Sequence, residues 1–449
     1  MVPLRCPTEY RFRLQESGRL NGRVVESVMW SSRRFAVVSL VGFCLVLARG
    51  DWLAWAQAHA DPSSQSLSAP SPAHSGLSFR PRDPLNDSGF EHFYSLRYDQ
   101  AIQDFERVLE KHPDDPFAVN HVLTALLIRE LYRMGAMNTG EYANDSFIGE
   151  AHHPADPRTK ERIKQLVQRA EKLEEQQLKA NSKNADALYA RGVTRAQFSV
   201  YTALVERAWF SALRNAVGAR HDHERVLELN PGYTDAKLVV GTHNYVMGSL
   251  PWGVKVAVSL VGLSGSKEKG FQYLYEAAGS TGETGVDAKV VLMLFLRREH
   301  RYEEALNITR GLIPRYPQNG LFALEEGNLL RAAGKKQEAA AVYRKVWEAG
   351  KEGRYPGVHY EMAALGLGDL LRWEKDYAGA ASAYELVGTT PQVDRELLQK
   401  ANLAAGEMYD LLQKRDLAVK KYAAVIAVNS GTGPAEMARK YMKEAYRDE

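Results

Sequence analysis

The chain has 449 residues, of which 45% are hydrophobic and 25% charged, and its formal net charge is +3. A charge so close to balance argues against a dedicated nucleic-acid binder unless basic residues are strongly segregated, and the sequence has no such basic block. Length and composition fit two or three globular domains, or one elongated array of repeats.

Residues 29–60 have the layout of a cleavable secretory signal. A basic pair at positions 33–34 precedes an apolar run over residues 35–48, and small residues follow up to Ala60. The polar stretch before Met29 lacks this layout, which indicates that Met29 is the true first residue. We therefore expect residues 1–60 to be an extension and signal, and the protein to be exported to the periplasm of a bacterium. The alternative is a retained N-terminal membrane anchor.

Both cysteines, Cys6 and Cys44, lie in this N-terminal part. The exported form would contain no thiol, so neither disulfides nor cysteine catalysis is expected. Residues 61–85 are rich in Ser, Pro and Ala and predict a disordered linker. The folded part is expected over residues 86–449.

The first helical pair is predicted directly after the linker. Gly89 stands twelve residues before Ala101, and the second helix, YDQAIQDFERVLEKHPDD, carries Phe105 four residues after that alanine. A helix over residues 116–132 follows and begins with proline, where the missing N–H costs nothing. Its partner is predicted over residues 160–179, after a long loop.

The next two pairs repeat these slots with substitutions. Gly192 takes the glycine slot of the third pair, and His223 takes the slot that Phe105 occupies in the first. In the fourth pair, Gly241 takes the glycine slot and Leu274 the aromatic slot. Both pairs carry insertions between their helices.

Residues 286–428 contain four clearer copies of the same hairpin. Their spacing is that of a tetratricopeptide repeat, with glycine where the first helix must let the second approach closely. A helix over residues 434–446 follows and is suited to capping the array. We predict an all-α fold: an α-solenoid of about eight tetratricopeptide-like hairpins with insertions, plus a C-terminal capping helix. The recurring residues are Ala305, Ala339, Ala380 and Ala418; Tyr343, Tyr384 and Tyr422; and Gly327, Gly368 and Gly406.

The insertion of the fourth pair carries a resemblance to a known family. GSLPWGVKVAVSLVGLSGSKEKGFQYLYEAA resembles the most distinctive segment of the tetratricopeptide-repeat 39 and inclusion-body-clearance (Iml) family, although Trp252 stands where a second proline is common and Ser266 replaces an aspartate. The resemblance covers residues 86–449. It implies an all-helical scaffold that binds partners, is associated in eukaryotes with organelle membranes or lipid droplets, and has no enzyme activity. The matching positions are Ser249, Leu250, Pro251, Val261, Gly262, Leu263, Ser264, Gly265 and Gly270.

We predict no catalytic, cofactor or metal site. In the cluster at residues 221–224, His223 should point into its helix pair while His221 faces elsewhere, so the two would not bind one metal. His152 and His153 lie in a predicted loop without further ligands at metal-site spacing. The sequence has no P-loop, GxSxG, HExxH or dinucleotide fingerprint. A periplasmic enzyme is the weakest of three function classes.

The preferred class is a scaffold that binds a protein or peptide in a concave groove lined by the first helices. Three arginines recur four residues after the glycine slot, and stacked repeats would align their guanidinium groups to bind carboxylates. The expected ligand is a segment bearing Asp or Glu, or a free C-terminal carboxylate. The alternative is that these arginines solvate the surface and complement the helix dipole. The groove candidates are Arg297, Asn328, Arg331, Asp369 and Arg372.

The second class is a membrane- or lipid-associated accessory protein that uses the apolar insertion over residues 247–265. The insertion is too short to span a bilayer and contains Lys255. It is expected either to be buried against the repeats or to dock on a membrane surface. The membrane-contact candidates are Leu250, Trp252, Val256 and Leu260.

Overall fold

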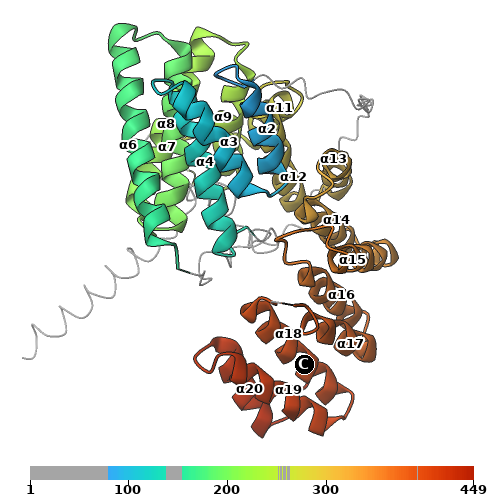
Figure 1. Ribbon diagram of the computed structural model, residues 1–449. Helices are drawn as coiled ribbons and strands as arrows, with labels where there is room; N and C mark the ends of the chain where they lie inside the picture. The colour runs from blue at the N-terminus through green and yellow to red at the C-terminus, as the bar shows by residue number, and fades with distance from the viewer. Residues whose placement is uncertain are drawn as a thin grey trace, which may run out of the picture. The chain divides into compact units, whose positions relative to one another are not determined.

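The computed structural model describes residues 79–137, 154–250, 252, 255, 259, 263–391 and 393–448. These ranges contain α-helices, one short 3-10 helix and no strand (Figure 1). The predicted all-α fold of helical hairpins is confirmed. The expected signal and most of the expected linker, up to residue 78, lie outside the described residues.

The chain divides into two compact units. Among the described residues, unit 1 contains 79–82, 108–137, 154–250, 252, 255, 259 and 263–291. Unit 2 contains 83–107, 292–391 and 393–448. The helices α3 (Tyr98–Lys111) and α12 (Gly285–Arg298) each contain a boundary between the units, and another boundary follows Arg82.

Unit 1 is built from hairpins in which α4 packs on α6, α7 on α8, and α9 on α11. Aspartate or asparagine caps the first turns of several of these helices: Asp156 Oδ2 accepts the amide of Thr159 at 2.7 Å, at a helix that begins with proline. The elements are α4 (Pro116–Arg133), α6 (Pro157–Ala180), α7 (Ala185–Leu204), α8 (Trp209–Leu229), η3 (Thr234–Ala236), α9 (Lys237–Ser249) and α11 (Lys267–Ala278).

Unit 2 contains the regular repeats, with α14 on α15, α16 on α17, and α18 on α19. Consecutive hairpins also pack on each other, through α15 and α16 and through α17 and α18. Its helices are α2 (Pro84–Tyr94), α13 (Tyr302–Arg315), α14 (Gly320–Ala332), α15 (Lys336–Lys351), α16 (Glu361–Trp373), α17 (Tyr377–Val387), α18 (Arg395–Leu411), α19 (Arg415–Val428) and α20 (Gly433–Lys443).

The glycine slot faces the aromatic slot in both units. A Cβ on Gly327 would lie 2.7 Å from Tyr343 Cε1, and one on Gly406 would lie 2.5 Å from Tyr422 Cε1. Such separations are shorter than van der Waals contact, so a side chain there would force the helices apart. The predicted repeat register is therefore confirmed. The same close approach joins Gly89 to Phe105, Gly192 to His223 and Gly368 to Tyr384.

The first hairpin departs from a simple array in chain order. α2 and the start of α3 group with unit 2, where the ring centroids of Tyr94 and Tyr316 lie 5.3 Å apart. Asn319 Nδ2 donates to the carbonyl of Tyr94 at 2.7 Å, and Arg315 pairs with Glu91 at 2.9 Å. The helix α2 thus packs beside the end of α13, which residue spacing alone does not indicate.

The predicted capping helix is α20, which ends three residues earlier than expected. Ala435 and Ala438 are fully buried against Ala418, Tyr422 and Val425 of α19. The helix ends early because Arg415 Nη2 donates to the carbonyls of Tyr441 and Met442, which would otherwise accept from the following turn.

Candidate functional site

Arg297, Arg331 and Arg372 occupy equivalent positions near the ends of α12, α14 and α16, as the register predicts. Arg297 Nη1 lies 3.0 and 3.1 Å from the two carboxylate oxygens of Glu325. Arg331 Nη1 lies 3.1 Å from Asp369, and Arg372 Nη1 lies 2.7 Å from Glu407. Each arginine therefore reaches a carboxylate on the first helix of the next repeat.

These contacts show that each guanidinium group of the predicted row is already paired with a carboxylate of the same chain. Stacking aligns the arginines, but it also brings an acidic residue of the following repeat beside each one. The arginines thus link successive hairpins within unit 2, and binding of a partner's carboxylate by them stays a prediction. Two groove candidates belong to the same network: Asn328 accepts from Tyr343 Oη at 2.8 Å, and Asp369 from Tyr384 Oη at 2.9 Å.

Two of the four membrane-contact candidates have side chains that the structure describes. Leu250 follows α9 and is buried, with 4% of its surface exposed, whereas Trp252 is 82% exposed. Val256 and Leu260 lie outside the residues whose side chains are described. No helix in the described part of the chain is long and apolar enough to cross a membrane.

The residues that flank this insertion bring α9 and α11 together. A Cβ on Gly265 would lie 2.6 Å from the carbonyl oxygen of Asn244, and one on Gly270 would lie 2.5 Å from the amide of Tyr245. His243 Nε2 contacts the Ser264 carbonyl at 3.2 Å. These members of the family-like segment therefore serve close helix packing.

Sequence reasoning missed a polar site of unit 1 that surrounds Arg80. The Arg80 guanidinium lies 4.3 Å from the ring centroid of Phe117, 5.2 Å from that of Tyr189 and 5.0 Å from that of Tyr233. Such distances allow cation–π attraction. We call these three rings, with the carboxylates of Asp186, Asp235 and Glu283, the arginine cage.

The three carboxylates reach different nitrogens of Arg80. Its Nη1 lies 2.6 Å from Asp186 and also bonds the hydroxyl of Tyr233; its Nη2 lies 3.7 Å from Asp235. Both Nε and the backbone N–H of Arg80 donate to Glu283 Oε1, at 3.2 and 2.6 Å. The cage therefore contacts the whole guanidinium fork and the main chain beside it.

The cage is assembled from the starts of successive first helices. Phe117 lies in the first turn of α4, Asp186 and Tyr189 in the first turns of α7, and Asp235 in η3. Asp235 also accepts from the amide and the hydroxyl of Thr284, each at 3.0 Å, just before α12. Repeat stacking therefore places the cage residues together.

The two most buried carboxyl groups of the cage have pKa values that are shifted in opposite directions. Burial raises the pKa of Asp235, and the hydrogen bonds from Thr284 only partly offset it. Burial also raises the pKa of Glu283, but the hydrogen bond and charge of His121, together with those of Arg80, lower it below its ordinary value. Glu283 is thus the carboxyl group that the site favours as an anion.

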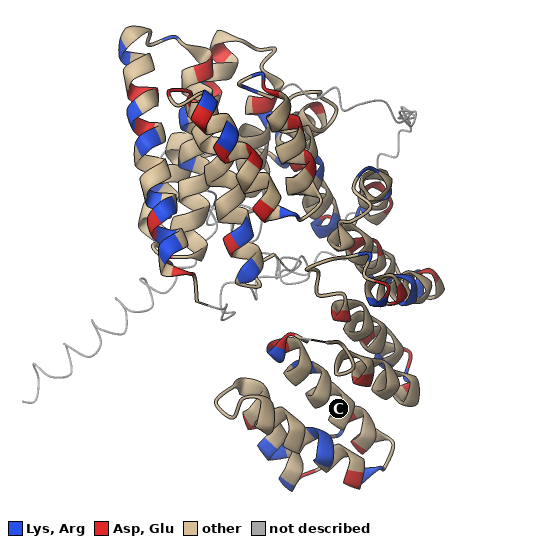
Figure 2. Ribbon diagram, in the orientation of Figure 1, with Lys and Arg blue, Asp and Glu red and all other residues tan. Residues whose placement is uncertain are grey.

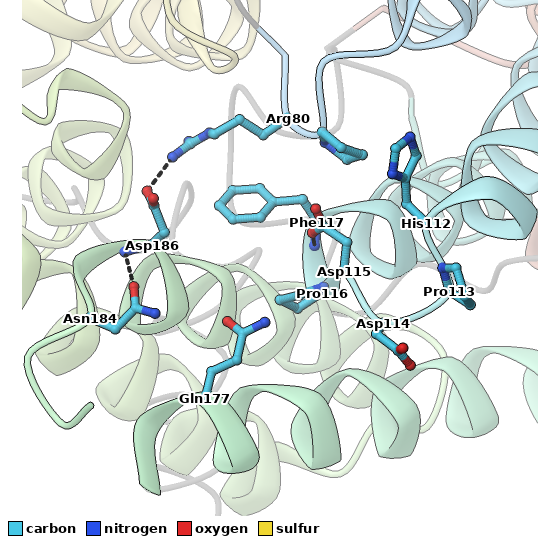
Figure 3. Close-up of a pocket in the computed structure, with 11 residues that line it drawn as sticks. Arg80, His112, Pro113, Asp114, Asp115, Pro116, Phe117, Gln177, Asn184 and Asp186 are labelled. Carbon is cyan, nitrogen blue, oxygen red and sulfur yellow. Dashed lines mark hydrogen bonds and ion pairs between the residues drawn. The ribbon is translucent and has the colours of Figure 1, made fainter. Parts of the chain in front are cut away.

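A pocket of about 580 Å³ adjoins Arg80 in unit 1 (Figure 3). It lies beside the first turns of α4 and α7 and the last turn of α6. Asp115 caps α4, accepting from Phe117 N at 2.8 Å, and Asn184 caps α7, accepting from Asp186 N at 3.1 Å. Besides Arg80, the polar residues that line it are His112, Asp114, Asp115, Gln177, Asn184 and Asp186.

The histidine cluster at residues 221–224 does not form a metal site. His223 is buried beneath Gly192, its Nδ1 contacts the Ala219 carbonyl at 2.7 Å, and His221 is exposed. Asp222 pairs with Arg191 at 2.5 Å and with Arg195 at 2.6 Å. No group of three or more potential metal ligands occurs in the part of the chain that is described, and His152 and His153 lie outside it.

Acidification is expected to destabilise unit 1 through His223. Burial lowers the pKa of His223 from 6.5 to about 4. Between these values the unfolded chain binds more protons, so the stability present above pH 6.5 is lost as the pH falls toward 4. In the wild type, His223 is expected to lower the free energy of unfolding by about 2 kcal/mol near pH 5. His223→Phe, which places the residue type of Phe105 in the same slot, should not show this contribution. Urea unfolding of wild type and variant at pH 7.5 and pH 5 measures this.

The matched control is His221→Gln, on the same helix at an exposed position. It should leave the pH dependence as in the wild type. An equal loss of stability on acidification in wild type, His223→Phe and His221→Gln would contradict the assignment.

Comparison with known proteins finds one family model that matches part of the chain. Residues 216–378 match the family model described as Iml2/Tetratricopeptide repeat protein 39. The match supports a tetratricopeptide-repeat protein. It spans less than half of the chain and includes the segment that carries the sequence resemblance. No curated protein matches the chain.

Several solved structures are similar to parts of this chain at low sequence identity. Pseudomonas aeruginosa pilF is 15% identical and covers 56% of this chain and 97% of its own, with a TM-score of 0.34. A human IFIT1 dimer with m7Gppp-AAAA is 12% identical and covers 82% and 84%, with a TM-score of 0.37. A tetratricopeptide repeat protein from Parabacteroides merdae ATCC 43184 is 14% identical and covers 75% and 97%, with a TM-score of 0.28. These likenesses concern the fold alone.

Proposed function

We propose that this chain is a non-catalytic helical-repeat scaffold that binds a protein or peptide partner. The family match and the repeated hairpins support a scaffold. The observation that carries the proposal is the arginine cage, in which the first helices of unit 1 surround an arginine from a short non-helical segment of the chain. A repeat surface that recognises such a segment in its own chain has the chemistry to recognise one in a partner.

The location proposed for this scaffold is the bacterial cell envelope. Its support is the signal-like layout of residues 29–60. Charge is mixed on the repeats, as Figure 2 shows along α6, where basic and acidic residues are interspersed. Such a surface favours protein contacts over nucleic acid. A partner with acidic side chains or a C-terminal carboxylate would compete with Glu325, Asp369 and Glu407 for the arginines of unit 2.

The test is site-specific crosslinking of the chain in cells. A photoreactive amino acid at Asp186 of α7 or Asp369 of α16 lies on a first helix at an exposed position, and matched controls at Arg225 of α8 and Ser382 of α17 lie on second helices. We expect one defined protein to be crosslinked from a first-helix position and not from the controls. Crosslinks from the controls alone, or from none of the four positions, would refute a scaffold that binds through its first helices.

The second candidate is a membrane-associated accessory protein, and the exposure of Trp252 favours it. Trp and similar residues are enriched at membrane surfaces because an apolar ring carries a polar N–H. The purified chain and its Trp252→Ser variant should be tested for flotation with liposomes. Flotation that Trp252→Ser abolishes, without any defined protein crosslink, would replace the scaffold by the membrane protein.

A further inference from the structure

The arginine cage has the features of a ligand site that is already filled. Its occupant, Arg80, belongs to residues 79–82, which group with unit 1, whereas residues 83–107 group with unit 2. Phe79 beside it is buried as well. The segment is non-helical, so its contacts with unit 1 are made by its own side chains and main chain and not by a repeat helix.

The walls of the cage are held by the repeat core and not by Arg80. Phe117 and Tyr189 belong to a buried cluster with Ala190, Val226 and Ala236. Tyr189 also packs edge-on against His223 at 5.2 Å. The aromatic walls are thus positioned by contacts among the hairpins themselves, so they are preorganised for a planar cation whether or not Arg80 contacts them.

The polar part of the cage is likewise anchored elsewhere. Asp235 accepts two hydrogen bonds from Thr284, and Glu283 interacts with His121. Three carboxylates surround one guanidinium, and a fork with five donors matches such acceptors in a way that a lysine ammonium does not. The pocket beside Arg80, with Asp114 and Asp115 on its wall, leaves space for residues that flank the arginine.

We propose that the arginine cage is a recognition site for an arginine-bearing segment of a partner protein, and that residues 79–81 occupy it in cis and exclude that partner. The proposal rests on the scaffold function above and names the partner chemistry that its first unit takes. The cage binds the guanidinium through Asp186, Asp235 and Glu283, and it binds the main chain through the hydrogen bond from the Arg80 N–H to Glu283. A partner segment binds when its arginine replaces Arg80.

The probe is a fluorescent peptide with the sequence of residues 74–82, HSGLSFRPR, titrated by anisotropy into the full chain. We expect Arg80→Ala to bind it at least tenfold more tightly than the wild type, because the variant leaves the cage vacant. The same peptide with lysine at the position of Arg80 should bind this variant at least tenfold more weakly. Arg82→Ala is the matched control: it removes an exposed arginine two residues away and should behave as the wild type.

Arg80→Lys is the second variant, because it keeps a positive charge beside Glu283 and Asp235 and loses the fork. It should bind the peptide more tightly than the wild type does. Equal binding by wild type and both variants, or equal binding of the arginine and lysine peptides, would overturn the proposal. Loss of folding in both variants, measured by circular dichroism, would also overturn the proposal, because Arg80 would then be required for the fold itself.

The two proposals fail separately. Crosslinking of a partner from the first helices, combined with no peptide binding by Arg80→Ala, would reject the arginine cage as a ligand site and keep the scaffold. Peptide binding by Arg80→Ala without any crosslinked protein would keep the cage as an arginine-binding site, and it would reject both the scaffold function and the protein partner.

Discussion

Replacing Arg297 by methionine is expected to cost about 3–5 kcal/mol of unfolding free energy, the range typical of breaking a buried ion pair. The reason is the burial of its partner: Glu325 is 1% exposed, and both of its carboxylate oxygens contact the Arg297 guanidinium. Methionine retains most of the aliphatic volume and removes the charge. Urea unfolding followed by circular dichroism at neutral pH gives the free energy.

Arg331→Met provides the matched control within the same repeat slot. Its partner, Asp369, has a side chain that is 48% exposed, so water replaces the lost cation. We expect a loss within about 1 kcal/mol, as for exposed ion pairs. A second check is the double variant Arg297→Met with Glu325→Gln, which should recover part of the loss because no buried charge remains. Equal small losses for Arg297→Met and Arg331→Met would show that burial of the carboxylate does not set the cost.

Replacing Gly368 by leucine should destabilise unit 2 by about 3 kcal/mol or more, at the upper end of overpacking effects. A Cβ there would lie 2.5 Å from Cδ1 and 2.9 Å from Cζ of the Tyr384 ring, which is itself 1% exposed. The ring cannot move without giving up its hydrogen bond to Asp369. Thermal unfolding should show a lower Tm, and the loss should stay near this hairpin because repeats contact mainly their neighbours.

Gly311→Ala is the contrasting change at a helical glycine. A Cβ at Gly311 meets nothing within 4 Å, so alanine should raise stability by about 0.5–1 kcal/mol through helix propensity alone. Adding Tyr384→Leu to Gly368→Leu should return part of the lost stability, because Leu274 fills the aromatic slot opposite Gly241. Similar melting temperatures for Gly368→Leu and Gly311→Ala would show that the glycine slot is not a tight contact.

The sequence by itself determined the hairpins and their register. Gly327 and Tyr343 lie sixteen residues apart, as do Gly368 and Tyr384, and this spacing is set within one hairpin by helix geometry and a short loop. The helix starts were readable for the same reason, since a capping Asp or Asn and a following proline act within one turn. Local rules were sufficient wherever both partners of a contact belong to one hairpin.

Only the tertiary structure decided what the polar residues do. Arg297 and Glu325 are 28 positions apart, and Arg331 and Asp369 are 38 apart, so each pair forms only when one hairpin stacks on the next. Arg80 reaches Glu283 across 203 positions. No local periodicity links such residues. Their partners follow from how the hairpins pack, because burial and charge neutralisation act on distances in space and not on positions in the chain.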